Sequence, residues 1–121
     1  MKKYRAGIDI GSTTVKLVLI DENDSIIFGK YRRHQAHTQE TLAELLDEAR
    51  QTVGECELQI KITGSGSINL GKALNIDFVQ EVVAVATALK KEAPQTDVAI
   101  ELGGEDAKII ILATGLDNKF M

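Results

Sequence analysis

Several residue types are scarce in this sequence of 121 residues, which has one cysteine, one proline, no tryptophan and 4% aromatic residues. The single cysteine, Cys56, excludes an internal disulfide. No apolar run approaches the roughly 20 residues that span a membrane, and the start Met-Lys-Lys-Tyr-Arg lacks a signal-peptide pattern. No basic stripe with interleaved aromatics accompanies the net charge of −4, which disfavours nucleic-acid binding. We therefore expect a cytoplasmic protein with neither a nucleic-acid nor a membrane partner.

The composition that remains is ordinary for a globular chain, with 44% hydrophobic and 26% charged residues, enough for one modest core. Alternating apolar residues and turn signals predict an α/β chain that opens with a three-stranded antiparallel meander. We predict strands over residues 3–10, 14–21, 25–33, 58–62, 77–80, 98–102 and 108–114, and helices over 39–53, 67–74 and 81–92. The strand over 58–62 follows a helical crossover, so it should run parallel to the first strand.

Two of the predicted helices have distinct apolar patterns. The first carries one apolar stripe, formed by Leu42, Leu45, Leu46, Ala49 and Val53. Thr38 or Thr41 could cap its start, and Gly54 is a plausible stop. The last helix is apolar around most of its circumference, through Val82, Val83, Val85, Ala86 and Leu89, so we expect it to be well buried. Pro94 should end it.

Residues 7–16 are the most informative segment and read Gly-Ile-Asp-Ile-Gly-Ser-Thr-Thr-Val-Lys. A strand enters a turn rich in hydroxyls and backbone N–H groups, and a second strand leaves it. Gly11 should permit a backbone conformation that a Cβ would penalise and let a ligand approach. The amides and hydroxyls of Ser12, Thr13 and Thr14 then form an anion-binding concavity. Asp9 offers a hard oxygen for Mg²⁺, and Lys16 a charge for phosphate.

A second segment repeats this arrangement loosely. In residues 97–111 an apolar strand ends at Glu101, a glycine pair follows (Gly103 and Gly104), and Asp106 precedes another apolar strand. Two hairpins of this kind, facing each other across a cleft, could hold a triphosphate from both sides. From the residues alone, an ordinary hairpin with a polar tip remains the alternative for the first segment.

The two segments resemble the phosphate-1 and phosphate-2 loops of the superfamily of actin, heat-shock chaperone ATPases and sugar kinases. The run Glu-Leu-Gly-Gly-Glu-Asp-Ala-Lys and the turn Thr63-Gly64-Ser65-Gly66 resemble one branch more closely. That branch comprises the ATPase activators of 2-hydroxyacyl-CoA dehydratases and the related benzoyl-CoA reductase ATPase subunits. The resemblance implies a ribonuclease-H-like (actin-like ATPase) α/β domain, whose mixed sheet combines the antiparallel meander with parallel strands and flanking helices.

The resemblance also implies roles for individual residues. Asp9, Glu101 and Asp106 would hold Mg²⁺, mainly through water, although Glu101 replaces the commoner Asp of the phosphate-2 pattern. Gly103 and Gly104 would bring their backbone to the γ-phosphate, and Glu81 would orient the attacking water.

Each of these roles has a plainer alternative. Glu81 could simply be an acid in the first turn of a helix, Asp106 a turn residue and Lys16 a solvated strand residue. His34 and His37 lie in a predicted loop without ligand partners, and we expect them to be solvated. Cys56 is expected to be a small buried or half-buried residue.

In the family, ATP hydrolysis drives a low-potential electron from a four-iron four-sulfur cluster, shared across a homodimer, to a dehydratase or reductase acting on a CoA thioester. The cluster ligands are absent here. We therefore expect a truncated chain, with a first domain over 1–93 and the opening hairpin of a second over 94–121, inactive as an ATPase by itself. The alternatives are a fragment of a sugar-kinase-like phosphotransferase and a non-catalytic nucleotide-sensing domain.

Overall fold

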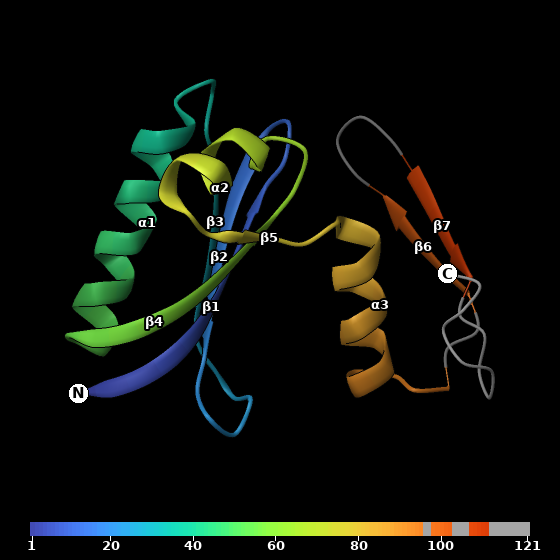
Figure 1. The fold of residues 1–121 in the computed structure, drawn as a ribbon, viewed down its shortest axis with the longest axis horizontal. Coiled ribbons are helices and arrows are strands. Elements are labelled where there is room, and N and C mark those ends of the chain that lie inside the picture. Colours follow the sequence, from blue (N-terminus) through green and yellow to red (C-terminus); the bar gives the residue numbers. More distant parts are fainter. Residues whose placement is uncertain (96–97, 103–106, 112–121) are drawn as a thin grey trace. The chain divides into compact units, whose positions relative to one another are not determined.

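The chain divides into two compact units, Met1–Val79 and Gln80–Met121. The computed structural model, drawn in Figure 1, describes residues 1–95, 98–102 and 107–111. The first unit contains strands β1 to β5 with helices α1 and α2, and the second contains α3 with strands β6 and β7. The domain boundary that we predict between residues 93 and 94 stays a prediction.

The first unit is built on one five-stranded mixed sheet in the order β3-β2-β1-β4-β5 (Figure 1). Its strands are β1 (Lys2–Ile10), β2 (Thr14–Ile20), β3 (Ile26–Arg33), β4 (Cys56–Thr63) and β5 (Asp77–Phe78). The first three pair antiparallel, whereas β4 runs parallel to β1 and β5 runs parallel to β4. The predicted meander and the parallel fourth strand are therefore confirmed, while β5 is shorter than predicted.

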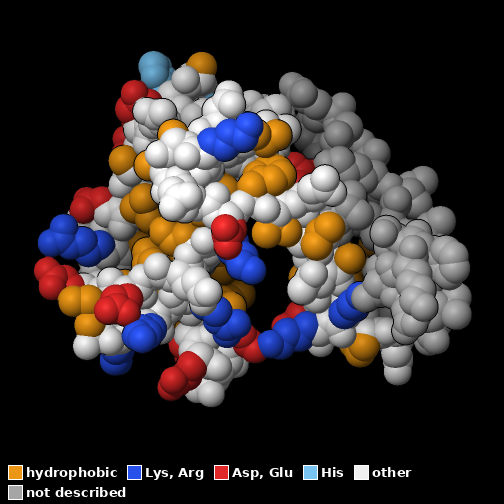
Figure 2. All heavy atoms as spheres, viewed as in Figure 1, with side chains coloured by type: hydrophobic (Ala, Val, Ile, Leu, Met, Phe, Trp, Pro, Cys, Tyr) orange, Lys and Arg blue, Asp and Glu red, His pale blue; other side chains and the backbone are white. Residues whose placement is uncertain are grey.

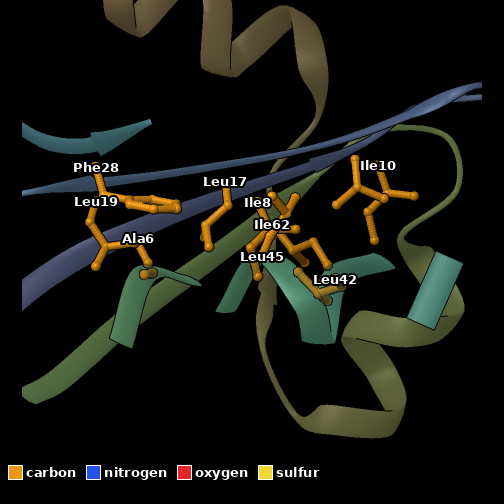
Figure 3. Packing of buried hydrophobic residues seen from close by; sticks show 11 residues of the cluster. Ala6, Ile8, Ile10, Leu17, Leu19, Phe28, Leu42, Leu45 and Ile62 are labelled. Atoms are coloured by element: carbon orange, nitrogen blue, oxygen red, sulfur yellow. The ribbon is translucent and has the colours of Figure 1, made fainter. Parts of the chain in front are cut away.

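The core lies between the sheet and two helices, α1 (Thr38–Val53) and α2 (Ile68–Leu74). Every second strand residue points to this face, as the pleat requires. Figure 3 shows Ile8, Leu17 and Ile62 from three neighbouring strands pointing toward Leu42 and Leu45 of α1. Each of these side chains is at most 5% exposed, and burying one contributes roughly 1.5–3 kcal/mol. The apolar stripe predicted for α1 is the face that packs here.

The remaining strand residues lie on the opposite face of the sheet. Asp9 of β1 has Lys16 of β2 as its partner on one side and Thr63 of β4 on the other. Because residues in register share a face, these three side chains form one row across the sheet. The row stands at the end of the sheet where β1 and β4 both finish.

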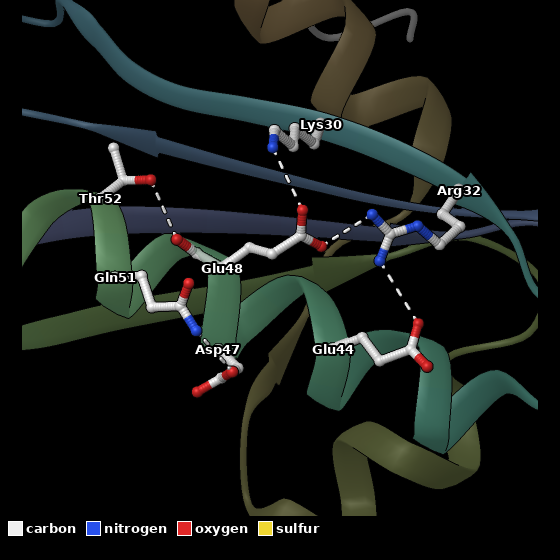
Figure 4. A network of polar contacts seen from close by, with 7 residues as sticks. All are labelled: Lys30, Arg32, Glu44, Asp47, Glu48, Gln51 and Thr52. Atoms are coloured by element: carbon white, nitrogen blue, oxygen red, sulfur yellow. Dashed lines mark hydrogen bonds and ion pairs between the residues drawn. The ribbon is translucent and has the colours of Figure 1, made fainter.

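Ion pairs connect β3 to α1 at the surface (Figure 4). The carboxylate of Glu48 lies 3.1 Å from Nζ of Lys30 and 2.7 Å from Nη2 of Arg32. Arg32 also reaches Glu44, with 3.3 Å between Nη1 and Oε2. Hydrogen bonds from Lys30 and Arg32 hold the pKa of the Glu48 carboxyl below its usual value, and Glu48 raises the pKa of Arg32. The connection is solvent-exposed, so each pair contributes little by itself.

The ends of α1 correct one prediction and confirm another. The N-cap is His37, so neither Thr38 nor Thr41 caps the helix. Thr41 lies one turn inside, where its hydroxyl donates to the His37 carbonyl oxygen at 2.7 Å instead of accepting from an N-terminal amide. Gly54 ends the helix as predicted, with φ +78° and its N–H 2.8 Å from the Arg50 carbonyl oxygen.

The second unit consists of α3 (Glu81–Glu92) and an antiparallel hairpin of β6 (Val98–Leu102) and β7 (Ala107–Ile111). The predicted helix and hairpin are confirmed, and α3 ends two residues before Pro94. Ala86 is buried against Val85, Leu89 and Ala99. Val83, expected to be buried, is 52% exposed, because the described contacts cover only one side of the helix.

Among the described residues, no helix is both long and apolar enough to cross a membrane. On the face drawn in Figure 2, acidic and basic side chains of the described residues are interspersed, and neither sign forms a continuous stripe there.

Candidate functional site

The site begins with the hairpin between β1 and β2. The Gly11 N–H donates to the Thr14 carbonyl oxygen at 2.9 Å, which leaves Ser12 and Thr13 as an exposed two-residue tip. Behind the tip, Nζ of Lys16 lies 3.8 Å from Oδ2 of Asp9, and the two side chains are 55% and 38% exposed. This ion pair is weak at such exposure. It nevertheless places a carboxylate and a cation beside a tip of hydroxyl groups.

Gly11 does not play the conformational part predicted for it. Its φ is not in the left-handed region, and a Cβ built on it would approach only Thr14 atoms, at 3.9 Å and beyond. The hairpin closes with ordinary backbone geometry, so its own packing places no demand for glycine at this position. Close approach of a ligand is the reason that remains for Gly11, and it stays a prediction.

A second turn, Thr63-Gly64-Ser65-Gly66, packs directly against the end of β1. The Gly66 N–H donates to the Ile10 carbonyl oxygen at 2.9 Å. Gly64 has φ +103°, and a Cβ on it would lie 2.2 Å from the Ile10 carbonyl oxygen and 2.7 Å from Oδ1 of Asp9. Only glycine fits there, since both the conformation and the space exclude a side chain. Two sequence motifs more than fifty residues apart therefore form a single site.

The base of this turn is held by a buried serine. Ser67 is 0% exposed, and its hydroxyl oxygen lies 2.6 Å from the Thr63 carbonyl oxygen and 2.7 Å from that of Gly64. In contrast, the side-chain oxygen of Thr63 is buried without a hydrogen-bond partner in the described part of the chain. The turn is thus rigidly positioned and carries one unsatisfied hydroxyl next to Asp9 in register.

His34 braces the hairpin tip, and the expectation that it would be solvated is wrong. The residue is half-buried, its Nε2 lies 3.0 Å from the Gly11 carbonyl oxygen, and its N–H donates to the Thr13 carbonyl oxygen at 3.0 Å. Its Nδ1 accepts from the Ala36 N–H at 3.1 Å. Because a carbonyl oxygen only accepts, these contacts assign the proton to Nε2. No local sequence signal marks His34, since its partners at the hairpin tip are over twenty residues away. His37 is exposed, as expected.

The other predicted site residues lie in the second unit or outside the described residues. Glu81 is the first residue of α3, and Glu101 lies on β6. Gly103, Gly104 and Asp106 lie outside the described residues. Cys56 is half-buried at the start of β4, as expected. The roles predicted for the acids and glycines of both loops stay predictions.

The donor atoms of the first unit suit a magnesium phosphate better than a metal held by protein alone. No group of three or more His, Cys, Asp or Glu side chains gathers for a metal in the described residues. Mg²⁺ needs no such group, because it is typically bound by one or two carboxylates, waters and substrate phosphates. Asp9, whose side chain is 38% exposed beside the hairpin tip, supplies a carboxylate of that kind. A four-iron cluster does not fit, since it needs several thiolates and the sequence has one cysteine.

Solved structures with the same architecture place the fold in a class. The chain matches the activator of 2-hydroxyisocaproyl-CoA dehydratase from Clostridium difficile with bound ADPNP, at a TM-score of 0.73 and 24% identity over 92% of this chain and 41% of that one. It matches component A of (R)-2-hydroxyglutaryl-CoA dehydratase from Acidaminococcus fermentans equally well, at 0.73 and 22% identity over 94% and 44%. The ethanolamine utilization protein EutJ from Carboxydothermus hydrogenoformans follows, at 0.66 and 16% identity over 93% and 48%.

The fold is therefore the ribonuclease-H-like fold of the actin-like ATPases, as predicted. Within that class, the predicted resemblance to dehydratase activators is confirmed at the level of the fold. No protein-family model matches the sequence, and no curated protein matches it either. The chain spans less than half the length of the structures named above.

Proposed function

We propose that this chain is the N-terminal, ATP-binding part of an ATP-hydrolysing activator that drives electron transfer to a CoA-thioester dehydratase or reductase. The observation that supports it most is the union of two turns at one sheet edge. Gly64 and Gly66 pack on the end of β1, which brings the Thr63 turn beside Asp9 and the hairpin tip. A solved activator of the same fold carries bound ADPNP.

In this proposal each part of the hairpin has a defined task. Ser12 and Thr13, exposed at the tip, bind phosphate oxygens through amides and hydroxyls. Asp9 holds Mg²⁺ directly or through water, and Lys16 beside it offsets phosphate charge. Bound Mg²⁺ would supply charge neutralisation to the phosphates. His34 keeps the tip in place through the carbonyl groups of Gly11 and Thr13.

The remaining parts of the proposed reaction belong to residues beyond the first unit. Glu81 would orient the attacking water, and Glu101 and Asp106 would complete the magnesium environment. The iron–sulfur cluster, the homodimer and the dehydratase or reductase partner are those of the proposed complete activator. No residue of this chain is assigned to the electron-transfer step, because its one cysteine cannot hold a cluster.

Titration of the 121-residue chain with Mg-ATP, followed by backbone amide NMR, tests the nucleotide site. We expect the amides of Gly11 to Thr14 to shift, with a dissociation constant above about 0.1 mM, because phosphate contacts from one hairpin supply only part of a nucleotide's binding energy. Asp9→Asn should abolish the dependence on Mg²⁺ while the spectrum stays folded. Asp47→Asn, an exposed change on α1, serves as the matched control.

One further ligand sharpens the test. Mg-AMP, which lacks the β- and γ-phosphates, should leave the tip amides unshifted at the same concentration. The proposed site would be refuted if Mg-ATP up to about 10 mM leaves the tip amides unshifted. It would also be refuted if the Asp9→Asn variant shows the same Mg-ATP shifts as the unchanged chain in the presence of Mg²⁺.

A further inference from the structure

The side-chain oxygen of Thr63 is the one buried side-chain polar atom in the described residues that has no hydrogen-bond partner. Leaving a buried hydroxyl unsatisfied costs about 1–3 kcal/mol. Buried polar groups in folded proteins are overwhelmingly paired, so an exception of this kind calls for a physical reason. Thr63 ends β4, a place where a valine of the same shape would suit the strand without that cost.

The position of Thr63 supplies a reason. In the parallel pairing of β1 with β4, Thr63 is the register partner of Asp9, and Asp9 is in turn the partner of Lys16. The three side chains share one face of the sheet, with the carboxylate between the hydroxyl and the cation. They stand where the parallel strands β1 and β4 end, which is the edge at which α/β sheets bind ligands.

The surrounding turn fixes the backbone beside Thr63. The buried Ser67 hydroxyl lies at hydrogen-bond distance from the Thr63 and Gly64 carbonyl oxygens. Gly64 packs against Ile10 so closely that a Cβ would overlap the Ile10 carbonyl oxygen. The backbone on the C-terminal side of Thr63 is thus fixed by contacts that leave its hydroxyl unused.

We propose that Thr63 is a ligand-binding residue, whose hydroxyl turns outward by rotation about Cα–Cβ when a magnesium-bound polyphosphate binds beside Asp9, and donates a hydrogen bond to one of its oxygens. The inference rests on the proposed function, because it assigns a further contact in that same site. In the free chain this hydroxyl is buried without a partner, which lowers the stability of the fold. Removing the hydroxyl should therefore weaken ligand binding without weakening the fold.

The test compares Thr63→Val and Thr63→Ser with the unchanged 121-residue chain, by thermal unfolding without ligand and by NMR titration with Mg-ATP. Valine keeps the shape and removes the hydroxyl, so we expect a melting temperature at or above that of the unchanged chain and about tenfold weaker binding. Serine keeps the hydroxyl and should bind within about threefold of the unchanged chain. Thr41→Val is the control, since that buried hydroxyl has a partner in the His37 carbonyl oxygen.

The control should melt at a lower temperature and bind Mg-ATP normally, the opposite of Thr63→Val. Equal binding by Thr63→Val and the unchanged chain would overturn the inference and leave the proposed function standing. A lowered melting temperature in Thr63→Val would also overturn it, since the hydroxyl would then have a structural role. If the unchanged chain shows no shift at the hairpin tip, the proposed function fails, and the role of Thr63 fails with it.

Discussion

Nε2 of His34 lies 3.0 Å from the carbonyl oxygen of Gly11, and this contact joins the end of β3 to the tip of the β1–β2 hairpin. The backbone of His34 makes a second connection, to the Thr13 carbonyl oxygen. One residue therefore restrains both sides of a turn whose own closure depends on the Gly11–Thr14 hydrogen bond. In the proposed phosphate site, a turn held in this way needs less ordering when the ligand binds.

The contacts of His34 predict which ring nitrogen carries the proton and how much the residue contributes to stability. We expect ¹⁵N chemical shifts to show that the neutral ring carries its proton on Nε2, because Nδ1 accepts from the Ala36 N–H. His34→Ala should destabilise the chain by about 1 kcal/mol and speed hydrogen exchange at Gly11. His37→Ala, at an exposed position, is the control. A ring protonated on Nδ1 alone, or equal effects of the two substitutions, would contradict this assignment.

Gly64 and Gly54 form a matched pair that separates conformational from steric cost. Both have positive φ, but a Cβ on Gly54 would meet nothing within 4 Å, whereas one on Gly64 would overlap the Ile10 carbonyl oxygen. We expect Gly54→Ala to cost about 1 kcal/mol, and Gly64→Ala about 3 kcal/mol or more. Urea unfolding measures both. Similar losses in the two variants would mean that the turn shifts freely away from β1.

The ion pairs between β3 and α1 predict a dependence of stability on pH. Hydrogen bonds from Lys30, and then from Arg32, lower the pKa of Glu48 from its ordinary value of 4.5. A carboxyl with a lowered folded-state pKa stabilises the fold above its unfolded-state pKa, and this contribution disappears as pH falls through the folded-state value. The stability attributable to Glu48 should therefore be constant from pH 7 to about 5 and decline below about 4.5.

Glu48→Gln tests this dependence, because glutamine cannot titrate. The drop in urea midpoint between pH 5 and pH 3 should be smaller in this variant than in the unchanged chain. Asp47→Asn is the control on the same helix, since Asp47 is exposed and accepts a hydrogen bond from the neighbouring Gln51 (Figure 4). If both variants retain the full acid-dependent drop, Glu48 is not part of its cause.

The hairpin of β6 and β7 predicts association between copies of the chain. It forms a separate two-stranded sheet, and its segments Val98-Ala-Ile-Glu-Leu and Lys108-Ile-Ile-Ile are strongly apolar. Two-stranded sheets are marginal in water, and apolar strand edges readily pair. Light scattering should therefore show a mass that rises with concentration. A strict monomer whose Ile109 to Ile111 amides are fully protected from exchange would argue against pairing.

The sequence by itself determined the local elements of this protein. Alternation of apolar residues located β1 to β4, because every second strand residue must face the core, and the stripe of α1 identified its packing face. The motif around Asp9 and the turn at Thr63 were each visible as short runs of small, polar residues. The α3 helix and the last hairpin were located by the same local rules.

Only the tertiary structure decided how those elements meet. The glycine that the chain itself requires is Gly64, not Gly11, because the Thr63 turn packs on the backbone of Ile10. His34 and Thr63 gained their significance in the same way, through partners more than twenty and fifty residues distant. Local periodicity carries no information about such contacts. The His34 contacts arise from the antiparallel pairing of β2 with β3, and those of Thr63 from the parallel register of β1 and β4.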